Sequence, residues 1–97
     1  MAYQIWTRVH LIETGTLIAE RETLQEREPD AEEVAIDAFT KANRGSYEPR
    51  IVESEQINPF FWKFIIRDTY SIAGDPELIS GDLLQMVWVS IHLRLDL

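Results

Sequence analysis

The sequence predicts an α+β fold: a single antiparallel sheet of about five strands with one helix packed on one face, in the order β-β-α-β-β-β. Three observations support this class. Five segments have the alternation, or the β-branched and aromatic content, of strands. One segment has apolar residues at helical spacing. The connections between neighbouring strands are short enough for antiparallel pairing.

The first two strands are expected to form a hairpin. Residues 3–12 (YQIWTRVHLI) alternate in character and are rich in β-branched residues, which is typical of a strand. The ETGT that follows predicts a turn around Gly15. Residues 16–24 (TLIAERETL) then predict the second strand, whose charged far end can continue as a loop.

The segment PDAEEVAIDAFTKANRG predicts the one helix. Asp30 can cap its N-terminus, and Glu33 three residues later completes a capping box. Lys41 and Arg44 fall in the last turn, where the helix dipole favours cations, and Gly45 supplies the stop. The apolar stripe consists of Ala31, Val34, Ala35, Ala38, Phe39 and Ala42.

Three further strands follow the helix. Residues 50–57 are polar for a strand, which favours an edge position. After a turn at Asn58-Pro59, residues 60–70 (FFWKFIIRDTY) predict a strong strand. Residues 71–82 contain Gly74, Asp75-Pro76 and Gly81-Asp82, which predict a loop. The last strand is expected over residues 83–97, to the end of the chain.

Strand alternation divides the apolar residues of the sheet between two faces, only one of which the helix can cover. The set expected under the helix is Ile5, Val9, Leu11, Phe60, Trp62, Phe64, Ile66, Val87, Val89, Ile91, Leu93 and Leu95. The set expected on the opposite face is Trp6, Arg8, His10, Phe61, Lys63, Ile65, Arg67, Trp88, Ser90, His92 and Arg94.

Length and composition limit the classes of protein. Ninety-seven residues predict a single acidic domain over 1–97 with a modest core. The absence of cysteine excludes disulfides, thiolate zinc sites and a thiol nucleophile. We see no signal peptide and no apolar run long enough for a membrane span, and therefore expect a cytoplasmic protein.

The net charge of −8 is concentrated in one region, because residues 13–37 hold nine acids and two arginines. Within Ala19–Phe39 the carboxylates are Glu20, Glu22, Glu26, Glu28, Asp30, Glu32, Glu33 and Asp37. Catalytic carboxylates need burial to shift their pKa values, whereas these are expected in a turn and on the polar side of a helix. The spacing of a calcium-binding EF-hand loop is absent. A solvated surface and an interaction surface remain as the two interpretations.

As an interaction surface, these eight carboxylates would steer a basic protein partner to the domain. That partner could be a nucleic-acid-binding protein, while the net charge of −8 disfavours direct binding of nucleic acid. In composition, the chain is similar to small acidic phage-type inhibitors that imitate DNA, although no residue motif carries this likeness. The hypothesis is therefore a non-enzymatic domain that docks on a basic surface as an inhibitor or adaptor.

An alternative hypothesis uses the sheet face opposite the helix, which combines aromatic with basic side chains. A homodimer or a ligand-binding protein would use this face through Trp6, Arg8, Phe61, Lys63, Trp88 and Arg94. A packed, purely structural role for these aromatics is a further interpretation.

Other patterns carry little chemistry. His10 and His92 are expected on one face and would be neighbours if their strands pair, but a metal site needs a third ligand. Ser90 and His92 lack an evident acid for a catalytic triad. We therefore expect no enzymatic activity, no cofactor and no bound metal.

Overall fold

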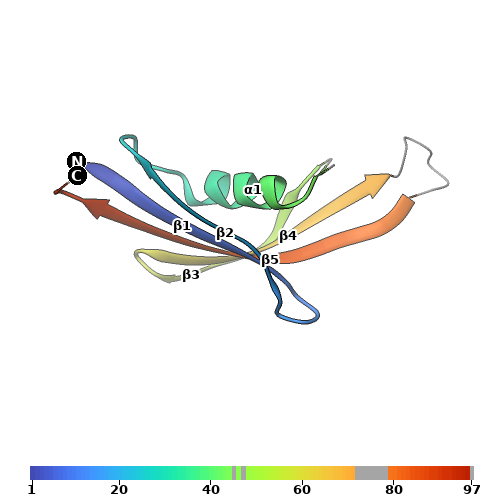
Figure 1. The fold of residues 1–97 in the computed structure, drawn as a ribbon. Coiled ribbons are helices and arrows are strands. Elements are labelled where there is room, and N and C mark those ends of the chain that lie inside the picture. Colours follow the sequence, from blue (N-terminus) through green and yellow to red (C-terminus); the bar gives the residue numbers. More distant parts are fainter. Residues whose placement is uncertain (45, 47, 72–78, 97) are drawn as a thin grey trace.

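The structure, a computed structural model, describes residues 1–97 apart from 45, 47, 72–78 and 97. It contains one five-stranded sheet and one helix, in the predicted order β-β-α-β-β-β (Figure 1). This confirms the predicted fold class. The elements are β1 (Ala2–Leu11), β2 (Leu17–Gln25), α1 (Ala31–Ala42), β3 (Arg50–Asn58), β4 (Phe61–Ser71) and β5 (Ile79–Arg94).

The strands are ordered β2-β1-β5-β4-β3, and every neighbouring pair is antiparallel. The central strand β5 pairs with β1 from Ala2↔Arg94 to Leu11↔Gln85, so the two ends of the chain lie side by side (Figure 1). The edge position predicted for residues 50–57 is confirmed, since β3 is the last strand. Its pairing with β4 is interrupted by two irregularities, which suit a strand with one unpaired side.

The last strand is longer at its start and shorter at its end than predicted. The expected loop at 71–82 is wrong for residues 79–82, which belong to β5; Thr69 pairs with Asp82. Pairing with β4 outweighs the turn preference of Gly81-Asp82, while residues 72–78 lie outside the described part. At the other end β5 stops at Arg94, because its partner β1 begins at Ala2.

The N-terminus of α1 begins at the predicted cap. Asp30 is the N-cap, and its side chain accepts a hydrogen bond of 2.9 Å from the backbone N–H of Glu32. The helix ends at Ala42 with Asn43 as C-cap, whose backbone N–H bonds to the carbonyl of Phe39. Gly45, the predicted stop, lies outside the described residues.

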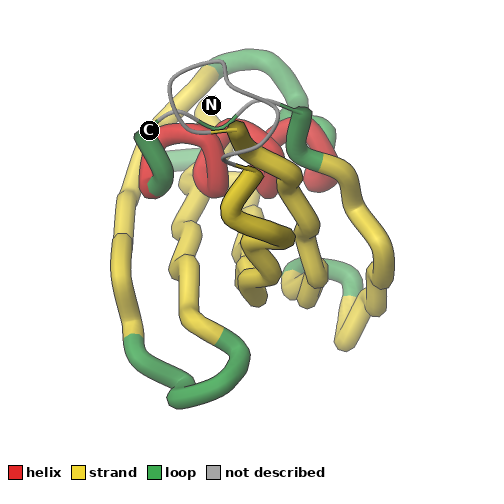
Figure 2. The backbone as a smooth tube through the Cα atoms, turned by 90° about the vertical axis from the view of Figure 1, so that its right-hand side faces the viewer, coloured by secondary structure: helices red, strands yellow, loops and turns green. Residues whose placement is uncertain are grey.

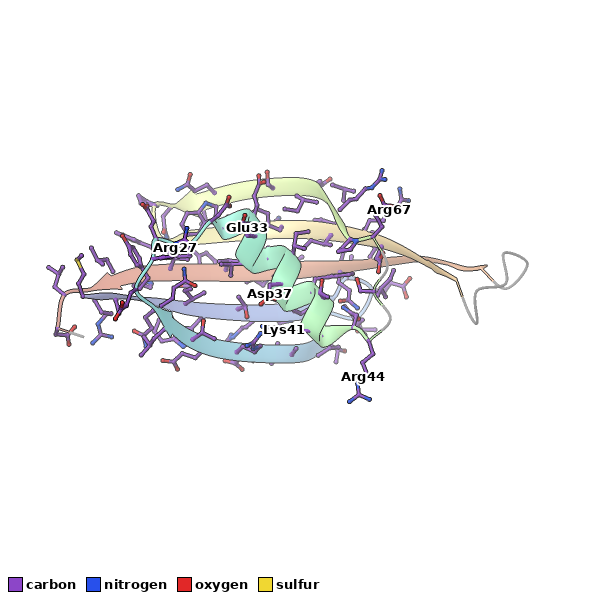
Figure 3. The ribbon with its side chains drawn as sticks, turned by 90° about the horizontal axis from the view of Figure 1, so that it is seen from above. Arg27, Glu33, Asp37, Lys41, Arg44 and Arg67 are labelled. Atoms are coloured by element: carbon purple, nitrogen blue, oxygen red, sulfur yellow. The ribbon has the colours of Figure 1, made fainter. Side chains whose placement is uncertain are left out.

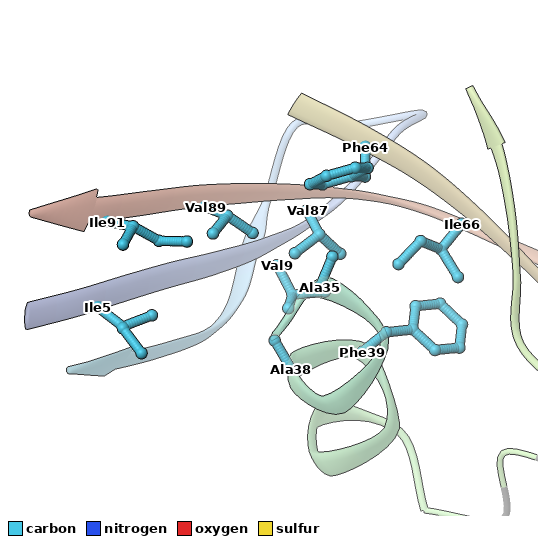
Figure 4. Close-up of a cluster of buried hydrophobic side chains, with 10 residues drawn as sticks. All are labelled: Ile5, Val9, Ala35, Ala38, Phe39, Phe64, Ile66, Val87, Val89 and Ile91. Carbon is cyan, nitrogen blue, oxygen red and sulfur yellow. The ribbon is translucent and has the colours of Figure 1, made fainter. Parts of the chain in front are cut away.

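The core lies between α1 and one face of the sheet (Figures 2 and 4). The helix contributes residues from the predicted stripe, of which Phe39 is completely buried. The sheet contributes side chains from its three central strands, as predicted by alternation. Among the residues whose burial the structure describes, ten hydrophobic ones are buried: Ile5, Val9, Ala35, Ala38, Phe39, Phe64, Ile66, Val87, Val89 and Ile91.

Three residues predicted under the helix are exposed instead. Leu93 is 45% and Leu95 is 77% exposed, because the helix reaches only the middle of the sheet (Figure 3). Twelve helical residues span about 18 Å, whereas the sixteen residues of β5 span about 53 Å. Phe60 is 52% exposed, because it lies in the turn before β4 and stacks on His92 of the opposite face. Leu11 and Trp62, from the same predicted set, are half-buried.

A buried amide pair joins the end of the helix to the central strand. Gln85 of β5 is 1% exposed and faces the helix, in a row of otherwise apolar side chains. Its Nε2 donates to Asn43 Oδ1 at 2.9 Å, and Asn43 Nδ2 donates to Gln85 Oε1 at 2.7 Å. Asn43 Nδ2 also bonds to the carbonyl of Phe39. The two amides therefore satisfy each other, and they fix the position of the C-terminus of α1 over β5.

The variant Asn43→Ala should lower the free energy of unfolding by about 1–3 kcal/mol, because it leaves the Gln85 amide buried without its partner. Chemical denaturation measures the loss. In Asn43→Ala/Gln85→Leu the unsatisfied amide is gone, so the double variant should be more stable than the sum of the two single changes predicts. Strict additivity would contradict this interpretation.

Candidate functional site

The sheet face opposite α1, called here the open face, carries one row of side chains that crosses all five strands. Reading across the strands, Glu20 pairs with Arg8, Arg8 with Trp88, Trp88 with Lys63, and Lys63 with Glu55. A tryptophan at the centre of the sheet therefore lies between two cations, each of which has a carboxylate on its outer side. The ion pairs Arg8–Glu20 and Lys63–Glu55 both measure 3.3 Å.

Aromatic rings surround this row. Phe61 stacks on Trp88, with ring centroids 5.1 Å apart and an interplanar angle of 18°. His92 contacts Trp6 edge-on at 6.0 Å and stacks on Phe60 at 5.3 Å. A shallow cleft of about 520 Å³ opens among Trp6, Arg8, His10, Glu20, Phe61, Trp88 and Ser90. The predicted aromatic and basic face thus exists, and the structure brings its members together.

Polar contacts continue along the open face toward the chain ends. Arg94 Nη1 donates to Gln4 Oε1 at 2.7 Å, and Gln4 in turn donates to Glu22. The Arg94 guanidinium also bonds to Asp96 at 3.2 Å and lowers the pKa of that carboxyl through this hydrogen bond and the positive charge. A similar contact with Glu48 raises the pKa of Arg50 at the start of β3. The cations of the open face named here therefore have anionic or amide partners.

The structure divides the eight carboxylates of the predicted acidic surface among different surroundings. Glu20 and Glu22 lie on the open face, where they contact Arg8 and Gln4. Asp37 lies on the helix and forms ion pairs with Lys41 at 2.9 Å and Arg21 at 3.6 Å. Glu20 and Asp37 are therefore paired with cations, whereas Glu22 accepts a hydrogen bond from the neutral amide of Gln4. Glu20 and Glu22 lie apart from the remaining five on the open face, while Asp37 lies on α1 one turn after Glu33.

The five others lie together in the loop after β2 and in the first turn of α1. All are exposed, and in the described part of the chain none of them forms an ion pair. Arg27 is the one cation within the same eight residues. This group, called here the acidic segment, consists of Glu26, Glu28, Asp30, Glu32 and Glu33.

A groove of about 750 Å³ runs between β2 and α1, beside the acidic segment. Its lining includes Ile5 and Thr7 of β1 and Val34 and Ala38 of α1, and the acidic segment contributes carboxylates at one end. The groove exists because α1 crosses the centre of the sheet and leaves part of β1 and β2 uncovered (Figure 3). Sequence reasoning did not find this groove.

The two histidines are not neighbours. His10 pairs with Met86 and His92 with Gln4, so six residues of β1, about 20 Å, separate them. His10 Nδ1 lies 3.1 Å from the carbonyl of Gly15, and His92 Nε2 lies 3.0 Å from Ser90 Oγ. Among the described residues, no three potential ligands gather as a metal site would require.

Three buried polar residues were not singled out from the sequence: Thr7, Asp68 and Gln85. Asp68 accepts a 2.7 Å hydrogen bond from the backbone N–H of Glu48 and so ties the segment before β3 to β4. Each of the three is a polar residue in the otherwise apolar set that its strand turns toward the helix. A polar residue at such an alternating apolar position is the feature of the sequence that could have identified them.

Comparisons with protein families, with curated proteins and with solved structures found no match. Within the described ranges, no helix is long and apolar enough to cross a membrane.

The helix cap provides a test of what Asp30 does apart from its charge. Asp30→Ala removes the acceptor for the Glu32 N–H and should cost about 0.5–2 kcal/mol of stability. Asp30→Asn keeps an acceptor oxygen and should cost clearly less, in thermal or chemical unfolding. Equal losses in the two variants would show that the charge, and not the cap, is what the helix needs.

Proposed function

We propose that this protein is a non-enzymatic interaction domain whose acidic segment docks on a basic surface of a protein partner, as an inhibitor or adaptor. The observation that carries the proposal is the contrast within the acidic stretch. Glu20, Glu22 and Asp37 have local partners, whereas the five carboxylates of the acidic segment have no ion pair among the described residues.

Part of this negative charge has a structural explanation. Asp30 caps α1, and Glu32 and Glu33 lie in its first turn, where the helix dipole stabilises anions. Glu26 and Glu28 precede the cap and contribute nothing of this kind to the helix. Their charge adds to repulsion within the segment, and a cationic partner would relieve that repulsion.

The partner is expected to be basic, since a field of one sign attracts and orients the opposite sign. A protein that normally holds nucleic acid has such a surface, and five carboxylates within eight residues can occupy positions that phosphates otherwise fill. The net charge of −8 disfavours nucleic acid itself as the ligand.

The variant Glu26→Gln/Glu28→Gln/Glu32→Gln/Glu33→Gln should lose the partner that the wild type captures from host lysate at about 50 mM salt. Raising the salt to about 500 mM should release that partner from the wild type, because exposed charges are then screened. Quantitative mass spectrometry identifies and compares the captured proteins.

The matched control is Glu13→Gln/Glu20→Gln/Glu53→Gln/Glu55→Gln, which changes the net charge equally at positions outside the acidic segment. It should retain the partner. If both quadruple variants behave alike, overall charge and not the acidic segment governs binding, and the proposal fails.

A second candidate function, self-association through the open face, is favoured by the ladder of aromatic contacts there. Trp6, Phe61 and Trp88 line a cleft on a face that α1 leaves uncovered. The ion pairs Arg8–Glu20 and Lys63–Glu55 flank Trp88 and leave this row of the open face without net charge. A second copy can therefore approach the row without the electrostatic repulsion that a net charge of −8 causes elsewhere on the chain. Uncovered aromatic surface of this kind is typical of protein contacts.

Under this candidate, the wild type should sediment as a dimer at tens of micromolar protein, and Trp6→Thr/Trp88→Thr should sediment as a monomer. Threonine retains a high strand preference. Leu93→Thr is the control, because Leu93 is an exposed hydrophobic residue that alternation places on the other face of β5. A wild type that stays monomeric throughout would eliminate this candidate.

A further inference from the structure

One hydroxyl that lines the groove between β2 and α1 has no hydrogen-bond partner among the described residues. Thr7 is 7% exposed and lines this groove. In the described part of the chain its hydroxyl takes part in no hydrogen bond, although the neighbouring side chains are well paired. The Thr7 oxygen is not among the fully buried side-chain atoms that lack a partner, so it is accessible from the groove. A ligand that displaces water from it must offer it a hydrogen bond, because burying a hydroxyl without one is costly.

The groove has two ends of different charge. At one end Thr7 lies opposite Arg21, which together with Lys41 surrounds Asp37. At the other end lie the carboxylates of the acidic segment, and Glu33 projects from α1 one turn before Asp37 (Figure 3). A cationic group is therefore favoured only at the acidic end.

The distance between the ends defines the length of a ligand that uses both. Tyr3 pairs with Gln25, the residue before Glu26, and lies four residues from Thr7 along β1. Four extended residues span about 13 Å. Between the ends the lining offers Ile5, Val34 and Ala38, against which the aliphatic stem of a lysine or arginine can pack. The volume of about 750 Å³ is within the range of ligand sites.

We infer that the groove between β2 and α1 receives an extended basic segment of the partner, about four residues long. A lysine or arginine of that segment meets Glu26 and Glu33, and the Thr7 hydroxyl donates a hydrogen bond to one of its main-chain carbonyls. This inference rests on the proposed function and adds to it the place of docking and the form of the ligand.

The test uses the peptide acetyl-Ala-Lys-Ala-Arg-Ala-amide and the full-length chain at low salt, followed by NMR titration of the backbone amides. The expected shifts concentrate at Ile5, Thr7 and Val34. Thr7→Val, which keeps the β-branched shape, should raise Kd on the order of five-fold, the effect of one neutral hydrogen bond. Glu33→Gln should also raise Kd, whereas Glu55→Gln on the open face should leave it unchanged.

The uncharged peptide acetyl-Ala-Gln-Ala-Gln-Ala-amide should not bind. The inference is overturned if the basic peptide does not bind the wild type, if its shifts fall on another surface, or if Thr7→Val binds it as the wild type does. In the last case, loss of binding in Glu33→Gln would still support acidic docking outside the groove. The proposed function is tested separately by the two quadruple variants in lysate, and it fails if they behave alike.

Discussion

The packing of a single short helix across the middle of a five-stranded sheet is the constraint on which the rest of this structure depends. Twelve helical residues can bury only the central part of one face, and they do so around Phe39. Among the described residues no second layer covers the opposite face, and a groove remains beside β2. Both candidate surfaces therefore follow from how little of the sheet one helix can cover.

Two interactions hold the helix in that position. Pairing of β1 with β5 joins the ends of the chain and creates the apolar surface on which α1 packs. The mutual hydrogen bonds of Asn43 and Gln85 then fix the C-terminus of α1 at one place on β5. Because apolar contacts are not directional, a buried amide pair specifies position more sharply than additional hydrophobic area would.

The position of the helix also determines which carboxylates remain available to a partner. Asp37 lies within reach of Arg21 because α1 crosses near β2, and alternation along β2 sends Glu20 to the other face beside Arg8. The carboxylates from Glu20 to Asp37 are continuous in sequence, but the structure divides them into a group with local partners and the acidic segment, which has no ion pair among the described residues. The acidic segment lies at one end of a groove that contains the Thr7 hydroxyl, so charge and shape coincide there.

The sequence by itself determined the element order, the capped helix, the edge position of β3 and most of the buried residues, because alternation and helical spacing are local properties. Pairing decided where β5 begins and ends, and the reach of α1 decided that Phe60, Leu93 and Leu95 stay exposed. Tertiary structure alone separated His10 from His92, split the acidic stretch and formed the groove at Thr7. The physical reason is that register and helix placement bring together residues distant in sequence, and no local pattern encodes those distances.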